Sequence, residues 1–217
     1  MSGRAPLGLF GGTFDPIHLG HLRLAEEAQE FLGLETVRFV PAGQPPHRAG
    51  PGVAAAERLA MVCLATRDNP AFAVDPSEVE SDEPSYTVPT LERLRREFGS
   101  ARPIVLLLGA DAFSALPTWH RWHDLLELAH IAVVHRGGKA PVAAELPAEL
   151  VQACITRHAE DPAALRESPA GCVLAVPMTP LAISATDIRA RLAARRSVRY
   201  LLPPEVLDYI RSRRLYA

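Results

Sequence analysis

Short apolar runs alternate with longer segments of helical period along most of the chain, and this alternation limits the fold more than any other feature. The runs are LGLF (7–10), VRFVP (37–41), FAV (72–74), PIVLLLG (103–109), IAVVH (131–135) and VLAVP (173–177). Runs such as 104–109 are apolar at consecutive positions, which is typical of parallel strands covered by helices on both faces. The sequence therefore predicts an α/β fold with a Rossmann-like, doubly wound parallel sheet and C-terminal helices.

Helical period is found in residues 19–32, 54–66, 90–98 and 125–129, and again after Ser184 and after Pro203. The Pro/Gly-rich segments 41–52 and 135–147 are expected to be loops, with a mobile excursion near 137–150. There is no internal repeat. We predict a single domain over 1–217, with a C-terminal helical portion at about 184–217.

Composition excludes several classes of protein. The formal net charge is -2, and basic and acidic residues are interspersed along the chain. This argues against an extended nucleic-acid-binding surface and against a polybasic membrane anchor, so any polyanion that the protein binds must be small. The longest apolar run is too short to span a bilayer. Cys63, Cys154 and Cys172 are far apart in apolar or helical surroundings, which predicts buried, free thiols in a reducing compartment. We expect a cytoplasmic protein.

The stretch GLFGGTFDPIHLGH (8–21) contains the densest chemistry. Gly11 and Gly12 follow a strand at its carboxyl end, where ligands bind in open parallel sheets and where absent side chains let a ligand approach the backbone. His18 and His21 fall in the first turn of the next helix, on one face, and Gly20 leaves room for a flat group. Free N–H groups and the helix dipole join the imidazoles there, so the pattern predicts a site for phosphate oxygens.

Two other interpretations of this stretch stay open at this stage. A lone His-x-x-His is more often incidental or part of a metal site, so His18, His21 and Asp15 could instead ligate the metal of a hydrolase. Bound zinc or iron, and turnover without ATP, would identify that enzyme. A non-catalytic nucleotide sensor would bind ATP and release no pyrophosphate.

GGTFDPIHLGH also resembles the signature of the nucleotidyltransferase superfamily that shares a His-x-Gly-His element. This superfamily includes the class I aminoacyl-tRNA synthetases, and in its members the motif binds the triphosphate of ATP. Within it, the order of further segments resembles the bacterial nicotinate-nucleotide adenylyltransferases over nearly the whole chain. These segments are PAGQPPHR, PSYTVPTL, LLGADAF with TWHRWHDL, AVVHRGG, ISATDIRARL and YLLPPEVLDYIRSRRLY. The resemblance implies transfer of AMP from ATP to nicotinate mononucleotide, giving nicotinate adenine dinucleotide and pyrophosphate in NAD biosynthesis.

The resemblance also implies roles for individual residues. It assigns catalysis to His18, His21 and Arg189. It assigns ATP and phosphate binding to Gly11, Gly12, Thr13, Phe14, Gly20, Arg48, Arg136, Ser184 and Thr186, and binding of the pyridine nucleotide to Tyr86, Thr87, Asp111 and Trp119. Mg²⁺ is expected to arrive with ATP, held mainly by phosphates, with no metal ligand from the protein. The expected partners are these small molecules, without nucleic acid or membrane, and a homo-oligomer stays open.

The chain departs from the family pattern twice. Arg48 stands where a Lys is usual, so a planar guanidinium with several N–H donors replaces a compact ammonium group. Ala185 stands where a second serine is common. A phosphopantetheine adenylyltransferase would share the His-x-Gly-His element but would have no use for Tyr86, Thr87 and Trp119.

Several of these positions also have a purely structural interpretation. Ser85 or Thr87 could cap the helix that follows, and Asp111 after its strand could do the same. Trp119 could belong to the core, and Trp122 is assigned there. Arg191, Arg195 and Arg196 fit a solvated helical face.

Overall fold

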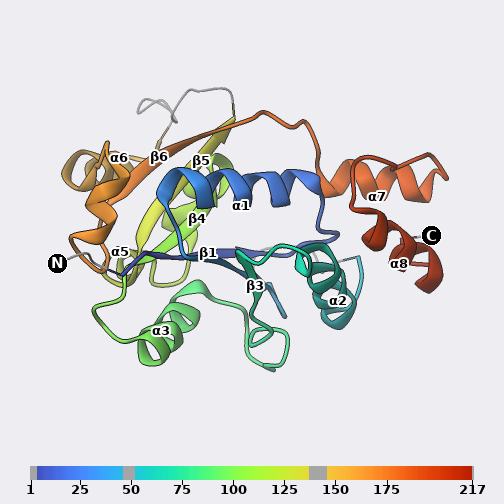
Figure 1. Ribbon diagram of the computed structural model, residues 1–217, viewed down its shortest axis with the longest axis horizontal. Coiled ribbons are helices and arrows are strands. Elements are labelled where there is room, and N and C mark those ends of the chain that lie inside the picture. Colours follow the sequence, from blue (N-terminus) through green and yellow to red (C-terminus); the bar gives the residue numbers. More distant parts are fainter. Residues whose placement is uncertain (1–3, 46–51, 137–145, 217) are drawn as a thin grey trace. The chain divides into compact units, whose positions relative to one another are not determined.

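The computed structural model describes residues 4–45, 52–136 and 146–216, and its centre is one six-stranded sheet (Figure 1). The strands are β1 (Leu7–Gly12), β2 (Thr36–Pro41), β3 (Phe72–Val74), β4 (Ile104–Gly109), β5 (His130–Arg136) and β6 (Val173–Met178), in the order β3-β2-β1-β4-β5-β6. The pairs β1–β4, β4–β5 and β5–β6 are parallel. This is the order of a doubly wound α/β sheet, so the predicted fold class is confirmed.

Helices connect these strands. They are α1 (Leu19–Leu32), α2 (Ala55–Thr66), α3 (Thr87–Phe98), α4 (Ala110–Ser114), α5 (Trp122–Leu128), α6 (Ala148–Arg157), α7 (Ala185–Ala193) and α8 (Pro204–Arg213), with 3₁₀ turns η1 (Leu116–Thr118) and η3 (Pro162–Arg166). Within the described residues, no helix is long and apolar enough to cross a membrane.

The chain clusters into two compact units. The first unit comprises 1–10, 25–37 and 86–180, and the second comprises 11–24, 38–85 and 181–217. Strands β1 and β2 each begin in the first unit and end in the second. The single domain expected over 1–217 stays a prediction.

The first unit is built on β4 and β5. Residues Ile104–Leu107 of β4 are at most 1% exposed, and Ile131–Val134 of β5 are at most 3% exposed. Leu91 and Leu94 of α3 are fully buried, and so are Ala25 and Ala28 of α1. Figure 1 shows these two helices on opposite sides of β1. The consecutive apolar residues of the strands are therefore covered from both faces.

His130 is a fully buried polar residue at the start of β5. Its Nδ1 accepts a hydrogen bond from the Cys172 N–H at 3.1 Å, and its Nε2 lies 3.0 Å from the Ser168 carbonyl oxygen. A carbonyl can only accept, so the ring carries its single proton on Nε2. Burial lowers the pKa of His130. The neutral imidazole is thus satisfied on both nitrogens.

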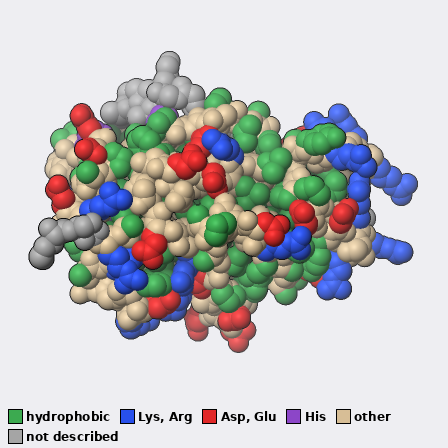
Figure 2. Space-filling model, viewed as in Figure 1, with side chains coloured by type: hydrophobic (Ala, Val, Ile, Leu, Met, Phe, Trp, Pro, Cys, Tyr) green, Lys and Arg blue, Asp and Glu red, His purple; other side chains and the backbone are tan. Residues whose placement is uncertain are grey.

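The second unit contains α2, β3 and the C-terminal helices. Tyr209 of α8 donates to the Glu57 carboxylate of α2 at 2.7 Å, and Arg213 pairs with the same carboxylate at 3.4 Å. Figure 2 shows basic side chains gathered over α7 and α8. Arg195 and Arg196 are exposed there, as predicted, and Arg191 pairs with Asp187 at 2.7 Å.

Three expectations need correction. Cys63, Cys154 and Cys172 are free, but Cys63 is exposed and the other two are half-buried, because the side chains that α2 buries are Arg58, Met61, Val62 and Thr66. Residues 148–150, expected in a loop, begin α6, while 137–145 lie outside the described residues. Helix α3 begins at Thr87, one turn earlier than its apolar period indicates, because an amphipathic stripe marks the buried face and not the first helical residue.

Candidate active site

The loop after β1 has a fixed shape. Phe14 is 3% exposed and has a left-handed backbone with φ 49°. A Cβ added to Gly12 would lie 3.0 Å from the Phe14 ring, so a side chain at position 12 would displace that ring. A Cβ at Gly11 would meet nothing within 4 Å. The predicted open approach to the backbone therefore exists at Gly11, whereas Gly12 accommodates Phe14.

The two histidines lie together at the start of α1. Their rings stack with centroids 3.6 Å apart and planes inclined by 20°. The backbone N–H of His18 donates to Nδ1 of His21 at 3.2 Å, which places the proton of a neutral His21 on Nε2. The edge of this ring also packs against Phe14, with centroids 5.1 Å apart. His21 is thus held in one orientation with an N–H donor at its outer nitrogen.

Gly20, which lies between His18 and His21 in the sequence, packs closely against the His18 ring. A Cβ at Gly20 would lie 3.1 Å from Cε1 and from Nδ1 of His18. The flat group for which Gly20 leaves room is therefore the imidazole of His18 itself. A direct role of Gly20 in ATP binding stays a prediction.

Arg58 belongs to this region, although sequence reasoning did not single it out. It is 0% exposed on α2 and donates from Nη1 to the Thr13 carbonyl at 2.7 Å and from Nη2 to the Gly43 carbonyl at 3.1 Å. Burial lowers the pKa of Arg58, and the negative charge of Asp15 opposes that shift. Its signal in the sequence is an arginine in the buried stripe of an otherwise apolar helix face. Arg58 fixes the backbone at Thr13.

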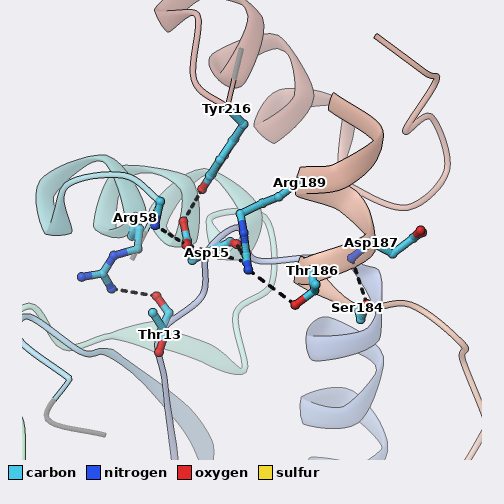
Figure 3. A network of polar contacts seen from close by, with 9 residues as sticks. Thr13, Asp15, Arg58, Ser184, Thr186, Asp187, Arg189 and Tyr216 are labelled. Carbon is cyan, nitrogen blue, oxygen red and sulfur yellow. Dashed lines mark hydrogen bonds and ion pairs between the residues drawn. The ribbon is translucent and has the colours of Figure 1, made fainter. Parts of the chain in front are cut away.

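Asp15 connects the loop to the C-terminal part of the second unit (Figure 3). Its carboxylate accepts from the Tyr216 hydroxyl at 2.7 Å and from the Gly52 N–H at 2.7 Å. Arg189 donates from Nη1 to the Asp15 main-chain oxygen at 2.6 Å, and the same nitrogen lies 3.7 Å from Oδ2. The structure therefore brings Arg189 of α7 to the loop that carries the histidines.

The start of α7 is capped by Ser184. Its hydroxyl accepts from the Asp187 N–H at 3.1 Å, which is the usual N-cap contact. Thr186 is exposed, and its hydroxyl accepts from Nη2 of Arg189 at 3.4 Å. Ser184 thus has a structural role, and its role in phosphate binding, like that of Thr186, stays a prediction.

In the first unit, α3 begins at Thr87 with Tyr86 as its N-cap residue and without a side-chain cap. The proposed caps at Ser85 and Thr87 are therefore wrong. The Ser85 hydroxyl instead accepts from the N–H groups of Gly43 and Gln44, at 2.8 and 3.1 Å, because it belongs to a loop pairing within the second unit. The half-buried Tyr86 ring lies against His120, with centroids 4.6 Å apart.

The remaining predicted residues lie on several elements. Asp111 is exposed in the first turn of α4, whose N-cap is Gly109 without a side-chain bond, so Asp111 is not a cap. Trp119 is half-buried after η1, and Trp122 is buried, as expected for a core residue. Arg136 is the last residue of β5, and Arg48 lies outside the described residues.

The predicted residues therefore fall into two sets. His18, His21, Arg189 and the loop after β1 belong to the second unit, and Tyr86, Thr87, Asp111 and Trp119 belong to the first. Arg136, predicted to bind ATP, also lies in the first unit. Across the described ranges, three or more His, Cys, Asp or Glu side chains do not group as metal ligands. The second-unit set is mainly a collection of N–H donors and cations, which suits phosphate oxygens.

Comparisons with known proteins agree with this chemistry. A family model described as cytidylyltransferase-like matches residues 9–191. A Dechloromonas aromatica protein named "Probable nicotinate-nucleotide adenylyltransferase" is 58% identical over 211 residues, covering 97% of each chain. A Pseudomonas putida protein of the same name is 49% identical over 210 residues, covering 97% of this chain and 94% of its own. At 16% identity, the structure of "Plasmodium falciparum nicotinic acid mononucleotide adenylyltransferase complexed with NaAD" matches the fold with a TM-score of 0.73, covering 98% of both chains.

Proposed function

This chain belongs to the nicotinate-nucleotide adenylyltransferases of the cytidylyltransferase-like family, and on this premise we propose which of its residues act in the transfer of AMP. The enzyme joins nicotinate mononucleotide to the AMP part of ATP, giving nicotinate adenine dinucleotide and pyrophosphate in NAD biosynthesis. The phosphate of the mononucleotide attacks the α-phosphorus of ATP in line, and pyrophosphate leaves from the opposite side.

The nucleophile needs no general base, because a phosphate monoester is already anionic near neutral pH. Catalysis then depends on holding the reacting groups in line and on stabilising negative charge on the α-phosphate and on the departing pyrophosphate. Donors with a fixed orientation suit this task, since they do not reorganise when the charge develops.

His18, His21 and Arg189 supply these donors in the second unit. The stacked rings, 3.6 Å apart, fix the orientation of His21, whose Nε2–H can donate to a phosphate oxygen. Arg189 donates from Nη1 to the Asp15 main-chain oxygen and from Nη2 to the Thr186 hydroxyl, and its side chain is 35% exposed, so the remaining N–H groups of the guanidinium can reach a ligand. The fixed orientation of the His21 ring, with Nδ1 bonded to the His18 N–H, is the observation that carries this assignment.

A divalent cation fits this site only as part of the nucleotide. The Asp15 carboxylate already accepts from Tyr216 and from Gly52, and the described residues contain no group of three or more His, Cys, Asp or Glu side chains that could hold a metal ion. Mg²⁺ commonly keeps its waters and binds phosphates, so it would neutralise part of the triphosphate charge while these residues orient the oxygens.

The pyridine nucleotide is recognised in the first unit. Helix α3 has no side-chain cap, so the N–H groups of Thr87 and Val88 and the helix dipole are available to the nicotinate carboxylate, whereas Pro89 has no N–H. Trp119 supplies a ring for stacking on the pyridine, and Asp111 supplies an acceptor for hydroxyl groups. Localisation in the cytoplasm, a homo-oligomer and the absence of nucleic-acid or membrane partners stay predictions.

This arrangement predicts a preference for the acid over the amide. A carboxamide loses the charge-assisted bonds and turns its NH₂ toward donors, which costs roughly 2 to 4 kcal/mol, or at least about thirtyfold in kcat/KM. Pyrophosphate release is measured with nicotinate mononucleotide, nicotinamide mononucleotide and phosphopantetheine, at saturating ATP and Mg²⁺. A ratio near one between the two mononucleotides would contradict the recognition argument, and ATP binding without pyrophosphate would indicate a sensor.

Thr87 offers a sharp test of the backbone donor. Proline is well tolerated at the first position of a helix, and Tyr86 has the extended conformation that a following proline requires, with φ -108° and ψ 138°. Thr87→Pro therefore removes one N–H with little cost to the fold, and it should reduce the acid preference more than the matched control Thr87→Val, which keeps that N–H.

A further inference from the structure

Tyr216 and Asp15 form a partly buried contact that the reaction described above does not use. Asp15 is 6% exposed, and one of its carboxylate oxygens accepts from the Tyr216 hydroxyl at 2.7 Å. Burial, followed by the hydrogen bond and the charge of Asp15, raises the pKa of Tyr216, so the hydroxyl keeps its proton and remains a donor. A hydroxyl donating to a carboxylate is a strong, charge-assisted bond.

The chain makes a tight turn to bring Tyr216 to this position. After α8, Arg214 has a left-handed backbone with φ 54°, and Tyr216 has φ 62°. Each left-handed residue that is not glycine costs roughly 1 to 2 kcal/mol, so contacts must hold such a turn in place. The Leu215 N–H donates to the Ile210 carbonyl of α8 itself at 3.0 Å, and the Tyr216–Asp15 bond connects the turn to the loop after β1.

Asp15, Tyr216 and Arg189 converge on the backbone of Gly52. A Cβ added to Gly52 would lie 3.4 Å from Cδ of Arg189, from Oδ2 of Asp15 and from Cε1 of Tyr216. The Gly52 N–H also donates to Oδ2 of Asp15 at 2.7 Å. The carboxylate is therefore oriented from two sides, by the tyrosine hydroxyl on Oδ1 and by the glycine N–H on Oδ2.

This orientation determines how Arg189 meets Asp15. Nη1 of Arg189 donates to the main-chain oxygen at 2.6 Å but stays 3.7 Å from Oδ2, which is an ion-pair distance and too long for a hydrogen bond. An aspartate without the two other donors would be free to rotate and bind the guanidinium bidentately, as carboxylates commonly do. Such a closed pair would occupy the donors that a phosphate needs.

We infer that Tyr216 and Asp15 are positioning residues for Arg189. The Tyr216 hydroxyl holds the Asp15 carboxylate in an orientation that attracts the guanidinium without forming a bidentate pair with it. The N–H groups of Arg189 therefore remain for the phosphates of ATP. The inference rests on the proposed role of Arg189 in phosphate binding. It adds the turn after α8 to the residues that act in nucleotide binding.

The test replaces Tyr216 by phenylalanine, which removes only the hydroxyl. Tyr209→Phe is the matched control, because it also removes one hydroxyl that donates to a carboxylate, that of Glu57, from the adjoining helix α8. In the full-length enzyme, Tyr216→Phe should lower kcat/KM for ATP about tenfold and leave KM for nicotinate mononucleotide within about twofold. Tyr209→Phe should change kcat/KM for ATP less than about twofold, and circular dichroism should show both variants folded.

A double-mutant cycle with Arg189→Ala separates this inference from the assignment on which it rests. If Tyr216 acts through Arg189, Tyr216→Phe should change kcat/KM for ATP less than about twofold in the Arg189→Ala background. An undiminished tenfold loss in that background would overturn the inference while leaving Arg189 as a phosphate ligand. Equal effects of Tyr216→Phe and Tyr209→Phe would overturn it as well, because they would indicate general docking of α8. Normal turnover of Arg189→Ala would refute the role of Arg189 and the inference with it.

Discussion

His21 offers the most direct test of the proposed phosphate site, because the structure gives its Nδ1 a contact within the protein and leaves Nε2 as the nitrogen proposed to meet the phosphate. Nδ1 accepts from the His18 N–H at 3.2 Å, so it has a structural contact. Nε2 carries the proton and is the nitrogen assigned to the phosphate. Glutamine places its amide nitrogen near the position of Nε2, whereas asparagine places its amide near Nδ1.

The size of the effect follows from the loss of one hydrogen bond to a charged group. Such a bond contributes about 1.5–3 kcal/mol, which corresponds to roughly 10- to 150-fold in rate when the bond acts in the transition state. His21→Ala should therefore lower kcat by more than about tenfold. His21→Gln should retain more activity than His21→Asn, since only glutamine restores a donor near Nε2.

Initial rates of pyrophosphate release, at saturating ATP and nicotinate mononucleotide, measure these differences. Thermal unfolding of each variant shows whether the stacking on His18 and the contact with Phe14, lost in all three variants, also affect the fold. A folded His21→Ala enzyme with normal turnover would refute the assignment. Higher activity of His21→Asn than of His21→Gln would show that the contact of Nδ1 with the His18 N–H is what matters.

Three further predictions concern other parts of the molecule. Trp119→Ala should weaken binding of nicotinate mononucleotide by about 1 to 3 kcal/mol in calorimetry and barely change ATP affinity, and equal losses for both ligands would indicate a structural tryptophan. The pKa of His130 is lower in the folded than in the unfolded state, so its contribution to stability is complete above about pH 6.5 and is lost as pH falls through the folded pKa, by at most about 1.4 kcal/mol per pH unit. Urea unfolding between pH 8 and pH 5 should show that His130→Gln removes this part of the pH dependence, and an unchanged dependence would contradict it. Ser184→Ala should lower the free energy of unfolding by about 1 kcal/mol through loss of the helix cap, and unaltered stability would show that the Asp187 N–H finds another acceptor.

The histidine pair could be predicted from sequence because its geometry is local. Residues at positions i and i+3 of one helix are neighbours whatever surrounds the helix, so the spacing of His18 and His21 already implied that they lie together. The caps assigned to Ser85 and Asp111 failed for the opposite reason. A cap is a single hydrogen bond, and Ser85 found donors in a loop at residues 43–44, which lies far from it in the sequence.

The sequence by itself predicted the strands and most of the helices, although not α4 or α6, and it placed the proposed phosphate loop at the end of β1, because burial on both faces and helical period appear in consecutive residues. Only the tertiary structure decided how Arg189 is held. Asp15 and Tyr216 are 201 positions apart, and Arg58 reaches the carbonyl of Thr13 across 45 positions. Polar contacts between such distant residues leave no periodic signal, because each needs only one side chain of suitable chemistry at a point that the folded backbone defines. Arg58 and Tyr216 therefore became functional candidates only once the chain was folded.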